Sequence, residues 1–266
     1  MIFPIGDDNR DRKSIPVVTI GLIAANILVF VLFQQMGANE QFTMSFSTVP
    51  EEIVTGQDVE TPAHVEVVQT NEGPRQEMVP GLGKTPIPVY LTILTSMFMH
   101  GGIAHLLGNM WFLWIFGDNI EDDMGRGRYL LFYLLCGIVA SLAHVAVSAG
   151  GEQANVPSLG ASGAISGVMG AYLVLHPKRR VTVFMLRLIM NVPGYVAVGL
   201  WFLFQIVSSL QIFQAPGTGG GVAYMAHIGG FVAGAALAYP FIAGRPLASQ
   251  RNDSYDQRAD QWSRFR

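Results

Sequence analysis

Residues 160–167 read Gly-Ala-Ser-Gly-Ala-Ile-Ser-Gly, and residues 226–234 read Ala-His-Ile-Gly-Gly-Phe-Val-Ala-Gly. Each stretch opens a long uncharged segment and carries one side chain, Ser162 or His227, that is costly to bury in apolar surroundings without a polar partner. A serine and a histidine are also a possible nucleophile and base. The two stretches therefore suggest that Ser162 and His227 meet, although 65 residues separate them.

The composition is that of a membrane protein. Half of the 266 residues are hydrophobic, only 13% are charged, and the mean hydropathy is +0.37, values too apolar for a soluble domain of this size. A net charge of −3 and the lack of a basic face outside short loops argue against a nucleic-acid partner. The single cysteine, Cys136, permits no intramolecular disulfide.

Six apolar segments have about the length that a helix needs to cross a hydrocarbon core of about 30 Å. They are residues 15–35, 95–116, 129–148, 159–175, 192–212 and 222–243. The first is longer than the apolar part of a signal peptide and lacks a clear cleavage site, so we expect it to be retained. These segments predict an all-α membrane protein with six transmembrane helices in contact with the lipid bilayer.

The distribution of positive residues predicts the orientation of the chain. Basic residues precede the first segment, separate the second from the third and the fourth from the fifth, and follow the sixth. The long stretch 36–94 lies on the other side and holds only Arg75 and Lys84 against eight acidic residues. Both termini are therefore expected in the cytoplasm.

The same pattern divides the chain into three parts. Residues 1–14 form a cytoplasmic amino terminus, residues 15–244 a six-helix domain, and residues 245–266 a polar cytoplasmic tail. Within the domain, residues 36–94 form a long outer loop between the first and second helices, with little helical periodicity. Such a length indicates a functional or partly embedded element. Residues 181–191 are expected to lie at the membrane interface, leading into the fifth helix.

Ser162 and His227 are expected at matching depths, because both of their helices enter from the outer face. Small residues recur along one face of each helix and allow their backbones to pack closely: Ser162, Ser166 and Gly170 on one, and Ala223, His227, Gly230 and Gly234 on the other. The alternative is a packing face on which the serine only bonds its own backbone.

The second helix adds His105 and Asn109, which lie one turn apart on one face. Both can donate hydrogen bonds to a developing negative oxygen, as acyl transfer requires. Asn109 could instead be a polar link between helices. His100 is expected at the water boundary as a cap or loop-positioning residue, and His144 is expected to be structural.

A metal site is disfavoured, although four histidines could in principle gather a zinc ion. No His-Glu-x-x-His sequence occurs, and the expected spans contain no acidic residue. We therefore predict no metal and no cofactor. The same lack of acidic residues argues against an intramembrane aspartyl protease and against a proton-coupled transporter.

From about Pro16 to Ala243 the chain resembles the rhomboid intramembrane serine proteases of the minimal six-helix, prokaryotic type. The resemblance rests on three motifs in order: His-x4-His-x3-Asn at His100, His105 and Asn109; Gly-x-Ser-Gly at Gly160, Ser162 and Gly163; and Ala-His-x2-Gly-x3-Gly at Ala226, His227, Gly230 and Gly234. Gly-x-Ser-Gly alone would be a weak signal, whereas the set is specific.

The resemblance implies a rhomboid-like bundle that cleaves single-pass transmembrane proteins near the outer face of a prokaryotic plasma membrane. It implies a dyad of Ser162 and His227, and an oxyanion hole formed by the Ser162 N–H with His105 and Asn109. Supporting roles would fall to Gly160, Gly163, His100, Ser166, Gly230, Gly234 and Trp201. Substrates would enter between the second and fifth helices, where Trp201, Phe202 and Phe204 supply bulk, and Glu121 would be structural.

Two departures from the family pattern stand out. Ser166 occupies the position at which some members carry a tyrosine that stacks on the histidine, so His227 must be oriented differently here. The Trp-Arg pair of the first outer loop is missing. A non-enzymatic rhomboid-like protein and a small transporter remain the alternatives, but non-enzymatic relatives typically lack the serine or the histidine.

Overall fold

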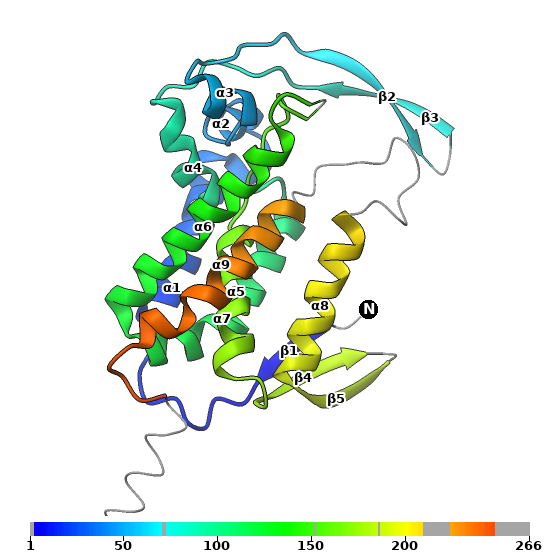
Figure 1. The fold of residues 1–266 in the computed structure, drawn as a ribbon. Helices are drawn as coiled ribbons and strands as arrows, with labels where there is room; N and C mark the ends of the chain where they lie inside the picture. Colours follow the sequence, from blue (N-terminus) through cyan, green and yellow to red (C-terminus); the bar gives the residue numbers. More distant parts are fainter. Residues whose placement is uncertain (1–2, 71–72, 152, 186, 210–223, 248–266) are drawn as a thin grey trace, which may run out of the picture.

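The computed structural model describes residues 3–70, 73–151, 153–185, 187–209 and 224–247 (Figure 1). Six apolar helical segments pack side by side. They are α1 (Val17–Leu28) with its continuation η1 (Val29–Phe33), α5 (Ile103–Met124), α6 (Arg126–Ser148), α7 (Ser162–Leu175), α8 (Gly194–Ser209) and α9 (Tyr224–Ile242).

Each predicted span overlaps one of these segments, which fit a membrane bundle. By length and composition α6 and α9 can each cross a membrane, and a bent pair ending in α5 makes a third candidate. The other three helical segments are apolar but shorter. The count of six spans therefore stays a prediction.

The second span differs from its predicted limits of 95–116. Residues Val89–Phe98 form η3 (Val89–Leu91), α4 (Thr92–Thr95) and η4 (Ser96–Phe98), and the chain then bends by 79° before α5 begins. Helix α5 continues past Phe116 to Met124, although its last turns are rich in carboxylates. Those carboxylates are buried, and each accepts a hydrogen bond from another segment of the chain. The helix can therefore continue beyond the point at which the hydropathy of the sequence falls.

The expectation of an all-α protein was incomplete. Strands β1 (Phe3–Asp7), β4 (Arg180–Met185) and β5 (Leu188–Pro193) form an antiparallel sheet in the order β1-β4-β5. The β4–β5 hairpin takes the place of the interfacial lead expected at 181–191. Its strand character follows from consecutive β-branched residues, of which Val181 and Val183 are buried and Thr182 is more exposed.

The outer loop also holds more regular structure than its sequence pattern indicates. It contains η2 (Gln35–Gly37), α2 (Glu40–Ser45), α3 (Pro50–Thr55), and a hairpin of β2 (His64–Thr70) and β3 (Gly73–Val79). In Figure 1 this hairpin extends sideways from the end of the bundle at which α2 and α3 lie. A backbone bridge between Thr48 and Ser158 ties the loop to the segment that leads into α7.

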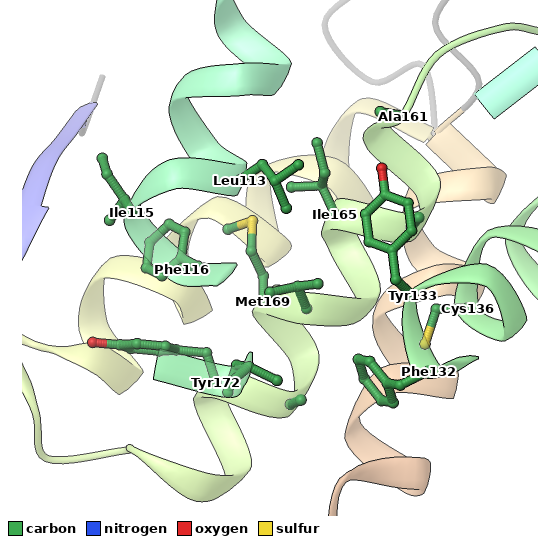
Figure 2. Packing of buried hydrophobic residues seen from close by; sticks show 14 of the residues in the cluster. Leu113, Ile115, Phe116, Phe132, Tyr133, Cys136, Ala161, Ile165, Met169 and Tyr172 are labelled. Atoms are coloured by element: carbon green, nitrogen blue, oxygen red, sulfur yellow. The ribbon is translucent and has the colours of Figure 1, made fainter. Parts of the chain in front are cut away.

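The core surrounds α7, in which residues 163–172 are all buried. Figure 2 shows side chains of α5 and α6 on either side of this helix. They include Leu113 and Phe116 of α5 and Tyr133 and Cys136 of α6, which pack around Ile165 and Met169 of α7, and each of these residues is at most 3% exposed. A helix that is apolar on every side belongs in the centre of a bundle, and this position fixes the start of α7, where Ser162 lies.

Helices α7 and α9 pack with their backbones in contact, as their small residues predict. A Cβ atom added to Gly234 would overlap the carbonyl oxygen of Gly167, and one added to Gly230 would overlap that of Gly163. Small residues permit this approach between membrane helices. The close packing brings the first turns of the two helices together.

Basic residues gather at the opposite end of α7. Arg12 forms an ion pair with Asp118, Arg179 donates to Asn119 at 2.8 Å, and Arg245 donates to the backbone oxygen of Asp123. We call this the basic end of the bundle. The prediction that it faces the cytoplasm rests on the positive-inside rule.

Candidate active site

Ser162 and His227 come together where α7 and α9 begin. Ser162 is the first residue of α7, and His227 lies in the first turn of α9. Nε2 of His227 is 2.8 Å from Oγ of Ser162, a hydrogen-bond distance. Residues 160–167 and 226–234 thus meet through these side chains.

The pair faces a cavity of about 410 Å³ between α5, α7, α8 and α9. This volume lies in the range of small-ligand sites, which are mostly apolar with a few polar groups. The polar side chains among the lining residues are His105, Asn109, Ser162, Ser166, Gln205 and His227. All of the predicted polar site residues except His100 therefore line this one cavity.

Asn109 and His105 offer hydrogen-bond donors at this cavity. Asn109 is 7% exposed, and its Nδ2 donates no hydrogen bond within the described residues. Nδ1 of His105 accepts weakly from the Gly101 N–H at 3.4 Å, so its proton is placed on Nε2. That Nε2 lies beside Gly160, where an added Cβ would come within 2.9 Å of it.

Gly160 is required for two local reasons. Its φ of +122° lies in a region that residues with a side chain rarely adopt, and the space that a side chain would need is taken by His105. Its N–H donates to the Ser96 carbonyl at 2.8 Å, which fixes the turn that delivers Ser162 to the start of α7.

His100, which was expected at the water boundary as a cap or loop-positioning residue, is buried within the protein. Its side chain is 1% exposed, and it is not among the residues that line the cavity. Its backbone N–H and carbonyl both bond the amide of Gln34, at 3.0 and 2.8 Å, and its ring packs edge-on against His105 at 5.2 Å. His100 thus fixes the break before α5 and one side of His105.

Ser166 has a backbone role. Its hydroxyl donates to the carbonyl oxygen of Ser162 at 2.6 Å, the pattern in which a helical serine bonds the preceding turn. That pattern was the alternative considered for Ser162, whose own hydroxyl instead faces His227.

Gln205 of α8 contacts His227 from the other side and is a site residue that was not predicted from the sequence. Its Oε1 is 2.8 Å from Nδ1 of His227, and its side chain is 6% exposed. Its signal in the sequence is an amide within the otherwise apolar helix Gly194–Ser209, which carries no charged residue. A polar group in such a helix is expected to need a partner.

Residues 89–244, more than half of the chain, match the family model of the Rhomboid domain. The chain belongs to the rhomboid family. This rhomboid is therefore a multi-pass membrane protein, in agreement with its apolar helices.

Three curated relatives show the breadth of the family. The chain is 37% identical over 148 residues to "Rhomboid protease GluP" of Bacillus subtilis, covering 56% of this chain and 26% of that protein. It is 30% identical over 182 residues to "Rhomboid protein 1, mitochondrial" of Saccharomyces cerevisiae, covering 68% and 49%. It is 35% identical over 150 residues to "RHOMBOID-like protein 6, mitochondrial" of Arabidopsis thaliana, covering 55% and 42%. The matches span about a quarter to a half of these relatives.

In this rhomboid an aromatic contact joins α5 to α8 beside the cavity. The rings of Phe112 and Trp201 are 6.4 Å apart, and Trp201 lies 6.1 Å from the ring of His227. Phe202 instead stacks on Phe231 of α9 at 3.9 Å, and Phe204 is 54% exposed. Of the three bulky residues expected between the second and fifth helices, Trp201 makes the contact between them.

Proposed function

We propose that this rhomboid is an intramembrane serine endopeptidase in which Ser162 is the nucleophile and His227 the general base. The observation that supports this most directly is the 2.8 Å contact of Ser162 Oγ with His227 Nε2 at the wall of a 410 Å³ cavity. A hydroxyl becomes a competent nucleophile when a base can take its proton.

In the first half of the reaction, His227 Nε2 takes the Ser162 proton while Oγ bonds to the scissile carbonyl carbon. The carbonyl oxygen becomes an oxyanion. Its donors would be Asn109 Nδ2, His105 Nε2 and the backbone N–H of Ser162. Because Ser162 begins α7, that N–H lies among the first four of the helix, which have no partner within it, and the helix dipole favours negative charge there.

In the second half, the imidazolium of His227 gives its proton to the leaving nitrogen as the C–N bond breaks. An acyl ester remains on Ser162. Water, deprotonated by His227, then attacks that ester, and the imidazolium returns the proton to Ser162 Oγ as the ester bond breaks. The acid product leaves and ionises to a carboxylate. The apolar helices around the cavity strengthen each of these electrostatic interactions relative to bulk water.

The substrates would be single-pass membrane proteins cleaved near the outer face of a prokaryotic plasma membrane, with both termini of the protease in the cytoplasm and six spans between them. A peptide bond inside a regular helix is not accessible, so helix-destabilising residues are expected near the cleavage site. Entry between α5 and α8 would require the contact of Phe112 with Trp201 to open.

The test is cleavage of a fluorescent transmembrane substrate by purified protein in liposomes. Ser162→Ala is expected to abolish cleavage without changing thermal stability, whereas Ser141→Ala on α6 serves as the matched control and should keep activity. Cleavage by purified Ser162→Ala at the wild-type rate would refute the assignment.

Labelling by a fluorophosphonate separates this function from the alternatives. The proposal predicts that Ser162 is labelled and that His227→Ala prevents labelling. A non-enzymatic helix-binding protein or a transporter predicts no labelling of Ser162 in the wild-type protein.

Lateral entry can be tested by joining α5 to α8. Cysteines at Phe112 and Trp201 would be bridged with a bifunctional maleimide, since the native Cys136 is fully buried. The bridge is expected to stop cleavage of the transmembrane substrate while leaving fluorophosphonate labelling intact, relative to the same unbridged double variant. Unchanged cleavage after bridging would contradict entry at this place.

A further inference from the structure

We propose that Gln205 is the positioning residue for His227, which makes the site a Ser162–His227–Gln205 triad whose third member comes from α8. This inference rests on the proposed function and extends it to a residue that the motifs of the family do not include here. It answers how His227 is held when Ser166 replaces the tyrosine of other members.

The hydrogen bond selects the useful tautomer of His227. The Gln205 atom that faces Nδ1 is the carbonyl oxygen, which can only accept, so Nδ1 must carry the proton. Nε2 then presents its lone pair to the hydroxyl of Ser162 at 2.8 Å. In serine proteases the same task falls to a carboxylate, and losing the correct tautomer there is costly.

The ring orientation is fixed by two helices other than its own. The imidazole is held at Nε2 by α7 and at Nδ1 by α8, and both contacts are 2.8 Å. Trp201 lies one turn before Gln205 on α8, so both side chains lie on one face, and its indole approaches the same imidazole. A side chain that is 6% exposed has few other conformations, so the amide can hold the ring still.

This arrangement links the base to the helix at which substrate entry is proposed. Trp201 contacts Phe112 of α5, and Gln205 on the same helix holds His227. A displacement of α8 away from α5 would therefore lengthen the Gln205–His227 hydrogen bond. His227 would again be aligned with Ser162 only when α8 moves back toward α5.

The experiment compares Gln205→Met and Gln205→Glu in liposomes, with Leu203→Met as the control. Methionine keeps the unbranched length of glutamine without the acceptor, and Leu203, two residues earlier on α8, is 53% exposed. Gln205→Met is expected to lower kcat and the rate of fluorophosphonate labelling about 10- to 100-fold, because the base loses its buried hydrogen-bond acceptor, with KM unchanged. Leu203→Met should match wild type.

The pH dependence of the Gln205→Glu variant tests positioning directly, because it would not change if Gln205 were only structural. A carboxylate restores the acceptor and stabilises the imidazolium, so activity should recover relative to Gln205→Met, and the acid limb of the rate profile should shift to higher pH. Among the residues that the structure describes, the other titratable groups that interact electrostatically with His227 are His105 of α5 and His144 of α6, and both are unchanged in every variant.

The outcomes separate this inference from the proposed function. If wild type neither cleaves nor is labelled at Ser162, the proposed function fails. If wild type is active but Gln205→Met performs like Leu203→Met, the positioning role alone is refuted. Should Gln205→Met unfold, the Gln205→Glu profile decides, and an acid limb at the wild-type pH would overturn the inference.

Discussion

Oε2 of Glu121 accepts hydrogen bonds from both the backbone N–H and the hydroxyl of Thr19, each at 2.8 Å. Oε1 of the same carboxylate accepts the N–H of Val18 at 2.9 Å. These N–H groups belong to the first turn of α1, where no helical carbonyl is available to accept them. Glu121 thus caps α1 from the side of α5, which is the structural role that the family resemblance implies.

Replacing Glu121 by alanine is expected to destabilise the protein by about 2–4 kcal/mol, because the donors of the partly buried Val18 and the buried Thr19 lose their acceptor. Glu121→Gln keeps one accepting oxygen and should fall between alanine and wild type. Thermal unfolding in detergent measures the order, with the exposed Glu60→Ala as control. Equal stability of the alanine and glutamine variants would contradict the capping role.

The contact of α7 with α9 predicts a pair of opposite results for glycine-to-alanine changes. Gly234→Ala should be strongly destabilising, because its Cβ would overlap the Gly167 carbonyl oxygen. Gly199→Ala on α8 meets no atom within 4 Å and should be neutral or stabilising by up to about 1 kcal/mol through helix propensity. Unfolding midpoints of the two variants in one detergent provide the comparison, and similar values would be inconsistent with this packing.

The carboxyl of Asp7 is expected to make the stability of the folded protein depend on pH. Burial, and next the neighbouring Asp118 carboxylate, raise the pKa of Asp7 from 3.8 to about 7. The folded protein therefore binds more protons at Asp7 than the unfolded chain does between about pH 4 and 7, and its stability from this group falls as pH rises through that window.

Asp7→Asn removes that dependence while keeping an acceptor for Tyr172 and Asn119, which bond Asp7 at 2.9 and 2.7 Å. The variant should gain stability relative to wild type between pH 5 and pH 8. Melting temperatures of both proteins across this range give the difference, in which contributions of unchanged groups cancel. A constant difference would show that Asp7 does not titrate there.

Asn109→Ala should lower kcat about 10²- to 10³-fold with little change in KM, because the donor would act on the oxyanion and not on the bound peptide. Steady-state cleavage in liposomes measures both constants. Asn191→Ala in β5, whose amide bonds Thr182 instead, controls for the loss of an asparagine. A rise in KM alone would assign Asn109 to substrate binding.

The apolar segments and the motif residues could be predicted because each depends on local sequence. Hydropathy locates the helices, and a buried hydroxyl and imidazole must find partners, which is why Ser162 and His227 could be paired without coordinates. Helical spacing placed His105 and Asn109 on one face, and the family resemblance implied their role as donors. All four line one cavity.

The remaining features depend on contacts between distant segments. The end of α5 could not be placed, because Asp118 and Glu121 lower hydropathy and become compatible with burial only through Arg12 and the start of α1. The strands β1 and β4 pair although helices α1 to α7 lie between them in the sequence. Gln205 was overlooked because an amide in a helix has many possible partners, and only the fold identifies His227 as the one.

Strand β1 leaves the ribosome before β4, but Asp7 pairs with Val181 and Phe3 with Phe184, which are synthesised only after α7. Until then the amino-terminal strand has no neighbour to bond. The basic end of the bundle can therefore close only late in biosynthesis, when α1, α5, α6 and α7 have already been made. A nascent chain halted before residue 180 would carry β1 without its partner strand β4, so backbone N–H and C=O groups of β1 that bond β4 in the folded protein would be exposed.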